Sequence, residues 1–167
     1  EVDGGKKVFK NREEIMDREK YVQSNEGDPE LLFYIPFNSQ VNIKNMIMVG
    51  GEEGSAPLHV KLYINQDHPD FSLMESTTCT QEFECVENAS GDIAYELKPN
   101  KFKSVTSLTL IVTKSYDVDF SKIYFLSFTG TRTKKKQTVM QGIYELKPLI
   151  DKSPVPEKFG NNDMIYG

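Results

Sequence analysis

The sequence has no tryptophan and is poor in cysteine and histidine, with two of each. A secreted domain stabilised by disulfides usually contains more cysteines, so Cys79 and Cys85 favour a reducing compartment. His59 and His68 supply the imidazole groups, and no Ser-His-Asp order or set of three metal-ligating residues accompanies them. No arrangement of residues typical of a catalytic site therefore emerges, and we predict that the protein is not an enzyme.

Long apolar runs and an excess of positive charge are also missing. No apolar run reaches the roughly 18 residues of a membrane-spanning helix. Lys and Arg total 20 against 25 Asp and Glu, which leaves a net charge of -5. Nucleic acids and anionic membranes are bound mainly by neutralising phosphates, which an acidic chain does poorly. We therefore expect neither nucleic acid nor a membrane as a partner.

Three short patterns resemble known sites without matching their chemistry. Residues 50–55 hold three glycines, but no Gly-Lys-Ser/Thr follows and two carboxylates would repel phosphate. Asp67, His68 and Asp70 surround a proline turn, and no matching ligand cluster occurs elsewhere in the sequence. Residues 88–90 fit the glycosylation sequon, which has no meaning in a reducing compartment. We expect no metal and no cofactor.

The sequence does contain strong strand periodicity, which is clearest from Leu31 to Gly51. Alternate residues from Leu31 to Phe37 are apolar, and alternation resumes from Val41 to Val49. The polar residues 38–40 separate the two blocks. A period of two on both sides of a polar break predicts two strands joined by a turn.

Similar alternation recurs along the chain and predicts an all-β fold. Further strand-like segments lie at residues 60–64, 93–97, 105–113, 123–128 and 139–146. About eight segments at even spacing, with almost no helical periodicity, predict an antiparallel β-sandwich of the jelly-roll type. An up-and-down barrel or an immunoglobulin-like sandwich is the alternative, although the Cys-Trp-Cys pattern of the latter is absent.

The length of 167 residues predicts a single domain. Residues 1–8 are polar and are predicted to be a loose leader. Residues 9–147 are predicted to form the sandwich domain, including an N-terminal strap held by Phe9, Ile15 and Tyr21. Residues 148–167 contain prolines and are predicted to be a C-terminal tail, partly packed or flexible.

With these segments placed, the chain resembles the PITH domain, a proteasome-interacting module found at the C-terminus of thioredoxin-like proteins and as a stand-alone protein. The resemblance covers roughly residues 8–142 and is most specific in residues 30–37. The matching segments are VFK at 8–10, REKYVQS at 18–24, ELLFYIPF at 30–37, VKLYIN at 60–65 and the aromatic run into glycine at 123–130.

The resemblance implies a galactose-binding-like jelly roll with a non-catalytic role. Stand-alone members without a thioredoxin domain are the most similar. The implied partner is the 26S proteasome or its regulatory particle, in the cytoplasm and nucleus. Thioredoxin chemistry needs a C-x-x-C pair, whereas five residues separate Cys79 from Cys85. Redox activity is therefore not implied.

Charged loops at the ends of a rigid sandwich are the candidate binding sites, and we expect a monomer. The basic cluster comprises Arg132, Lys134, Lys135 and Lys136, and the acidic loop contains Glu52 and Glu53. Basic charge on an acidic protein can steer an acidic partner. The alternative is a solvated turn whose lysines protect a strand edge. The tail, Ser153–Gly167, is a third candidate because its prolines and apolar end could dock in extended form.

A carbohydrate- or other ligand-binding module is the alternative function. The jelly-roll fold hosts lectins, so the fold alone is compatible with sugar binding. Sugar sites generally need exposed aromatic platforms, and tryptophan is absent. The sequence therefore favours an interaction module.

Overall fold

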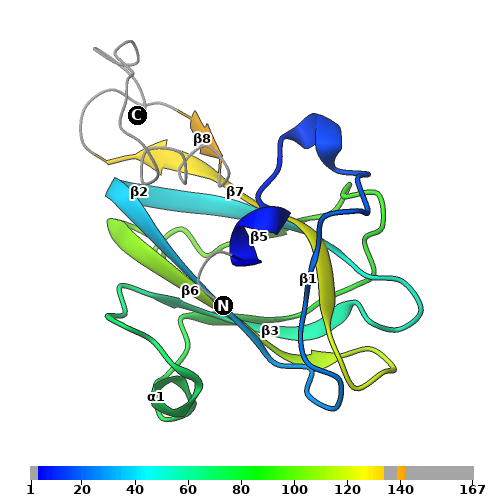
Figure 1. Ribbon diagram of the computed structural model, residues 1–167. Helices are drawn as coiled ribbons and strands as arrows, with labels where there is room; N and C mark the ends of the chain where they lie inside the picture. The colour runs from blue at the N-terminus through cyan, green and yellow to red at the C-terminus, as the bar shows by residue number, and fades with distance from the viewer. Residues whose placement is uncertain (1–3, 134–138, 142–167) are drawn as a thin grey trace.

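A computed structural model describes residues 4–133 and 139–141, and these form an antiparallel β structure with very little helix (Figure 1). The predicted all-β antiparallel sandwich is confirmed. None of the helices in the described part of the chain has the length and apolar character needed to span a membrane. The elements in chain order are η1 (Gly4–Val8), η2 (Arg12–Glu14), β1 (Val22–Gln23), β2 (Leu31–Gly50), β3 (Pro57–Ile64), α1 (Phe71–Glu75), β4 (Gln81–Glu84), β5 (Ala94–Glu96), β6 (Val105–Ser115), β7 (Lys122–Arg132) and β8 (Val139–Gln141).

Strand β2 belongs to both layers of the sandwich. Its residues 31–36 pair antiparallel with β6, and its residues 41–50 pair antiparallel with β7. The strand bends sharply between these parts, at the upper left of Figure 1. The turn predicted at residues 38–40 is therefore a corner within one continuous strand. The chain changes partner through a register shift between Pro36 and Val41 and does not leave the sheet.

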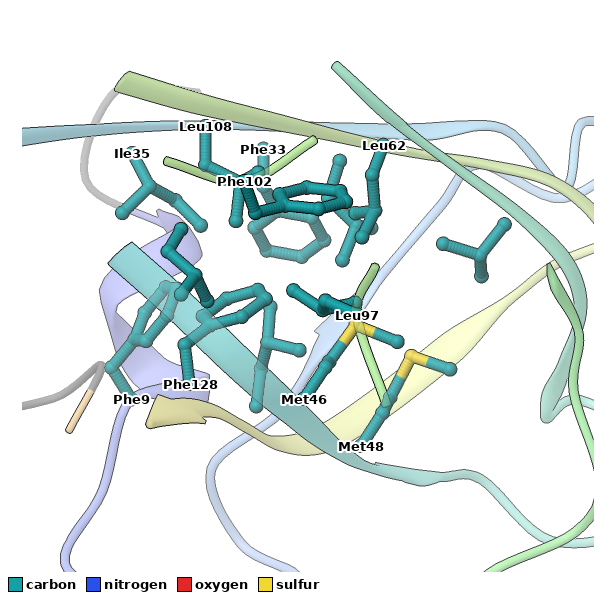
Figure 2. Packing of buried hydrophobic residues seen from close by; sticks show 14 of the residues in the cluster. Phe9, Phe33, Ile35, Met46, Met48, Leu62, Leu97, Phe102, Leu108 and Phe128 are labelled. Atoms are coloured by element: carbon teal, nitrogen blue, oxygen red, sulfur yellow. The ribbon is translucent and has the colours of Figure 1, made fainter. Parts of the chain in front are cut away.

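The bend in β2 places two sets of strands face to face. Hydrogen-bonded neighbours follow the order β1-β7-β2-β6-β3-β4, with β5 beside β2 and β8 beside β7. The main core lies between the layers and contains large side chains from both of them (Figure 2). Those that are at most 1 % exposed include Ile35, Met46, Leu62, Leu97, Phe102, Leu108 and Phe128.

Side chains close the sandwich along the edge formed by β4 and β5. The rings of Phe83 and Tyr95 meet edge to face with centroids 5.4 Å apart. The side-chain amide of Gln81 donates to the carbonyl of Glu96 at 3.2 Å and accepts from the backbone N–H of Lys98 at 2.9 Å. The short edge strand β4 is therefore tied to the opposite layer by its side chains.

The N-terminal segment differs in part from its prediction. Residues 4–8, expected in a loose leader, form a 3₁₀ helix instead, because Val8 is fully buried in the core. In the predicted strap, Phe9 is buried, Ile15 packs on a second cluster around Val49, and Tyr21 lies edge-on to the ring of Tyr124. The predicted C-terminal tail, residues 148–167, lies outside the described residues.

Candidate interaction surface

Two loops meet at one end of the sandwich and make it acidic. The loop after β2 and the loop after β6 are joined by backbone hydrogen bonds, from Asp117 N–H to the Gly54 carbonyl at 2.9 Å and from Lys122 N–H to the Ser55 carbonyl at 2.8 Å. The exposed carboxylates on these loops, which we call the acidic end, are Glu52, Glu53, Asp117 and Asp119.

The sequence-predicted residue Glu52 is engaged within the molecule. One carboxylate oxygen accepts a hydrogen bond from the Tyr124 hydroxyl at 2.8 Å, and the other lies 3.4 Å from Nε of Arg18. Glu53 is exposed and takes a positive φ of 55° at the tip of the loop. Of the two predicted acidic residues, Glu52 joins the loop to the strap, and Glu53 faces solvent.

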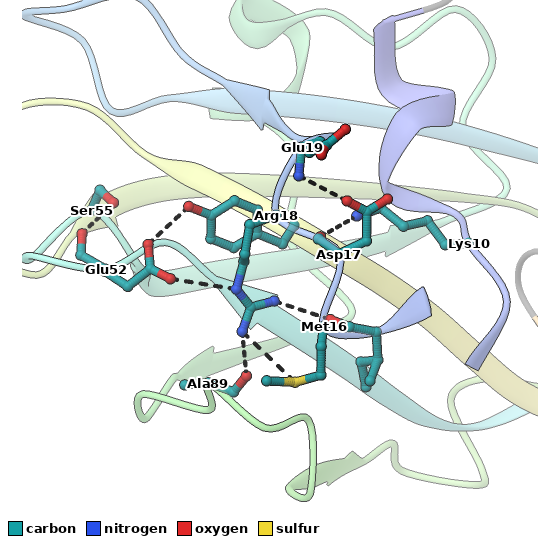
Figure 3. A network of polar contacts seen from close by, with 10 residues as sticks. Lys10, Met16, Asp17, Arg18, Glu19, Glu52, Ser55 and Ala89 are labelled. Atoms are coloured by element: carbon teal, nitrogen blue, oxygen red, sulfur yellow. Dashed lines mark hydrogen bonds and ion pairs between the residues drawn. The ribbon is translucent and has the colours of Figure 1, made fainter. Parts of the chain in front are cut away.

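Arg18 is the centre of this polar network (Figure 3). Its guanidinium donates to the carbonyl of Ile15 at 3.0 Å and to that of Ala89 at 2.8 Å. The same group lies 4.7 Å from the centroid of the Tyr124 ring, within the range of a cation–π contact. One side chain thereby connects the strap, the loop after β2, strand β7 and the loop between β4 and β5.

The Tyr124 hydroxyl remains a hydrogen-bond donor over the physiological pH range. Burial first, and then the hydrogen bond to Glu52, raise the pKa of Tyr124 to about 12. The phenol is therefore protonated at neutral pH, and the bond to Glu52 persists. Beside it, the ammonium group of Lys122 lies 4.8 Å from the centroid of the Tyr21 ring.

Sequence reasoning missed Arg18 and Tyr124 as partners of Glu52. Both residues lie in segments that carry the PITH resemblance, residues 18–24 and 123–130. The resemblance marks these segments as characteristic of the family, but it does not predict that the residues touch. No spacing rule relates residues so far apart in the chain. Their meeting depends on where the strap crosses the sandwich.

Replacing Arg18 by methionine is expected to lower the free energy of unfolding by about 1–2 kcal/mol, because two hydrogen bonds, an ion pair and a cation–π contact are lost together. Arg18 is only 27 % exposed, so solvent screens these contacts incompletely. Urea denaturation measures the change. Lys20→Met is the matched control, because Lys20 is 60 % exposed and pairs with Glu14 at 3.8 Å. An equal loss in both variants would contradict the role given to Arg18.

The predicted basic cluster is described only at its start. Arg132 ends β7, is partly buried and pairs with Val41 at the corner of β2. Lys134, Lys135 and Lys136 lie outside the described residues, as does the tail candidate Ser153–Gly167. Their role in binding therefore stays a prediction.

Two of the residues considered for catalysis or metal binding, Asp70 and His59, make contacts within the fold. Asp70 caps α1, where its carboxylate accepts from Leu73 N–H at 2.7 Å. The His59 ring lies 2.6 Å from the Thr113 hydroxyl and 3.6 Å from Glu82. Within residues 4–133 and 139–141, no group of three His, Cys, Asp or Glu side chains is placed to hold a metal ion.

The two cysteines do not form a disulfide, and they differ in environment. Cys85 is 2 % exposed, and burial raises the pKa of its thiol to about 11. The reactive form of cysteine is the thiolate, which Cys85 does not reach near neutral pH. Cys79 is partly exposed, and its sulfur lies 3.9 Å from a carboxylate oxygen of Glu82.

The sequon asparagine, Asn88, is also used by the fold. Its amide nitrogen donates to the carbonyls of Met48 at 3.1 Å and Ile93 at 2.9 Å. Its amide oxygen accepts from Ile93 N–H at 3.1 Å. Asn88 is 6 % exposed, so attaching a glycan would require breaking this loop.

A family model for the PITH domain matches residues 1–148. The chain belongs to the PITH domain family. Among its relatives, PITH domain-containing protein 1 of Dictyostelium discoideum is 37% identical over 143 residues, which cover 86% of this chain and 70% of that protein. The mouse and human proteins of the same name are 33% and 32% identical, each covering 80% of this chain and 62% of the relative. The chain thus spans less than two thirds of the mammalian relatives.

Family membership supports a role as a protein-interaction module. The names of the relatives record the PITH domain and no enzymatic activity. The polar network fits this role as well, since its hydrogen bonds hold surface loops of the PITH domain in place. A rigid surface loses less conformational entropy when it binds a partner.

Proposed function

We propose that this PITH domain is a non-catalytic adaptor that docks on the regulatory particle of the 26S proteasome in the cytoplasm and nucleus. The proposal rests on one observation, that the chain belongs to the PITH domain family. The resemblance to this family is what implies the proteasome as the partner. The chain would act as a monomer that joins the particle to another factor.

The charge distribution supports docking through polar surfaces. Glu53, Asp117 and Asp119 are exposed on the acidic end. Exposed charges of one sign on a fixed surface accelerate encounter with a partner of opposite sign. A large particle offers many such surfaces, and a small rigid domain can recognise one of them without changing shape.

Affinity capture tests the proposal. The tagged full chain is incubated with a cell lysate at low salt, and the captured proteins are quantified by mass spectrometry. Subunits of the regulatory particle are expected to be enriched about tenfold or more over a control β-sandwich of similar size and net charge. Because exposed charges are screened by salt, capture should fall as the salt concentration rises above roughly 0.15 M. Equal recovery with the control protein would overturn the proposal.

A further inference from the structure

A second charged surface lies in the segment between β5 and β6, at the end of the sandwich where β2 bends. Three lysines in this segment are exposed, and we call them the lysine turn: Lys98, Lys101 and Lys103. The buried side chains of Leu97 and Phe102 alternate with them and point into the core (Figure 2). The turn therefore presents its cations outward and its apolar residues inward.

The backbone of the lysine turn is held on both sides. The Phe102 carbonyl accepts from Ile43 N–H at 3.0 Å, and Ser104 N–H donates to the side chain of Asn42 at 3.0 Å. Within the turn, Lys101 N–H donates to the Lys98 carbonyl at 2.9 Å. Only the lysine side chains remain to be ordered when a partner binds, which keeps the entropy cost of binding low.

The ammonium groups of the lysine turn form no ion pair within the described residues. Lys101 Nζ contacts the Thr80 carbonyl at 3.3 Å. No ion pair among residues 4–133 joins the three lysines to Glu96, the nearest acid along the chain, or to another carboxylate. Three positive charges on a rigid turn thus stand out on a protein whose net charge is -5.

We propose that the lysine turn binds an acidic segment of a protein partner, rich in Asp and Glu. This inference rests on the proposed function and specifies the chemistry of the partner. A protein segment fits better than nucleic acid, because a long phosphate backbone would also meet the field of a chain whose net charge is -5. A short acidic segment needs to contact only the turn. Each lysine ammonium is a compact charge with three rotatable donors, so it can pair with a carboxylate without one fixed geometry.

A titration with a defined probe tests the inference. The full chain is titrated against a fluorescein-labelled peptide of ten glutamates by fluorescence anisotropy at about 0.15 M salt. Lys98→Glu/Lys103→Glu is expected to weaken binding about tenfold or more, because two attractive contacts become repulsive. The matched control is Lys20→Glu/Lys114→Glu, which changes two other exposed lysines by the same charge and is expected to remain within about twofold of wild type. Thermal unfolding checks that both variants are folded.

Three results would overturn the inference: no peptide binding by the wild-type chain, equal weakening in both variants, or tighter binding of a ten-nucleotide single strand than of the peptide. Sedimentation velocity could give a fourth such result. If the wild-type chain self-associates and the lysine-turn variant does not, the turn binds a second copy of the chain and not an acidic partner.

Capture of the regulatory particle separates the two proposals. Capture that survives the lysine-turn variant overturns this inference alone, whereas peptide binding without capture overturns only the proposed function.

Discussion

Replacing Gly130 by alanine is expected to lower the free energy of unfolding by about 3 kcal/mol or more, enough to leave little folded protein. A Cβ atom at this position would overlap the carbonyl oxygen of Asn42 and lie 2.9 Å from the Cα of Ile43. Both contacts are with backbone, so no side-chain rotation relieves them. The β2–β7 ladder, which shifts register just after Ile43, would have to separate. Urea denaturation and the yield of soluble protein measure the effect.

Gly27→Ala is the matched control for this prediction. Gly27 has a φ of +86°, and a Cβ atom there would meet nothing within 4 Å. Its cost should be limited to backbone strain of about 1 kcal/mol. If both variants unfolded at the urea concentration of the wild type, the close approach of β7 to the bulged part of β2 would be disproved.

Replacing Phe102 by alanine is expected to lower the free energy of unfolding by about 3–5 kcal/mol, the usual range for removing a buried aromatic side chain. Phe102 is fully buried and packs in the main core, so its loss leaves a cavity. The same side chain anchors the lysine turn. The variant, if it is purified at low temperature, is therefore expected to bind the acidic peptide more weakly although every lysine is retained.

Two further variants separate the cavity from a general effect of alanine. Tyr34→Ala removes an aromatic side chain that is 43 % exposed and should cost less than about 1.5 kcal/mol. Phe102→Leu refills part of the cavity and should recover much of the stability and of the peptide binding. Equal losses for Phe102→Ala and Tyr34→Ala in thermal denaturation would show that Phe102 does not hold the turn.

The strands were predictable because their signal is local. In residues 31–37 every second side chain is apolar, and in residues 41–49 Asn45 alone interrupts the same pattern. The register shift between Ile43 and Asn45 was not predicted, and after it Met46 and Met48 face the main core while Val49 packs in the second cluster. The same reasoning predicted the strap, since Phe9 and Ile15 are apolar residues in a charged segment that must be covered. Apolar residues on both faces of Ile123–Phe128 predicted a central strand covered on both sides, and this segment is buried within β7.

The corner of β2 was not predictable in its observed form. Polar residues at 38–40 predict a turn, and a turn and a bent strand have the same polar signature. Only pairing with different neighbours distinguishes the two, and Val41 pairs with both Val105 and Arg132. The 3₁₀ helix at Gly4–Val8 was not predictable for a related reason, because the burial of Val8 depends on the space that the sheets leave open.

The candidate binding surfaces show most clearly what the sequence determines by itself and what depends on tertiary structure. The sequence alone predicted an all-β fold with charged loops, because composition and period-2 alternation are properties of neighbouring residues, and its resemblance to the PITH domain pointed to the family. Tertiary structure decided which charges are available to a partner. It paired Glu52 with Arg18 and Tyr124, whereas the lysine turn forms no ion pair in the part of the chain that the structure describes. Charge pairing depends on contacts between residues that lie far apart in the chain, and those contacts exist only once the strands have assembled.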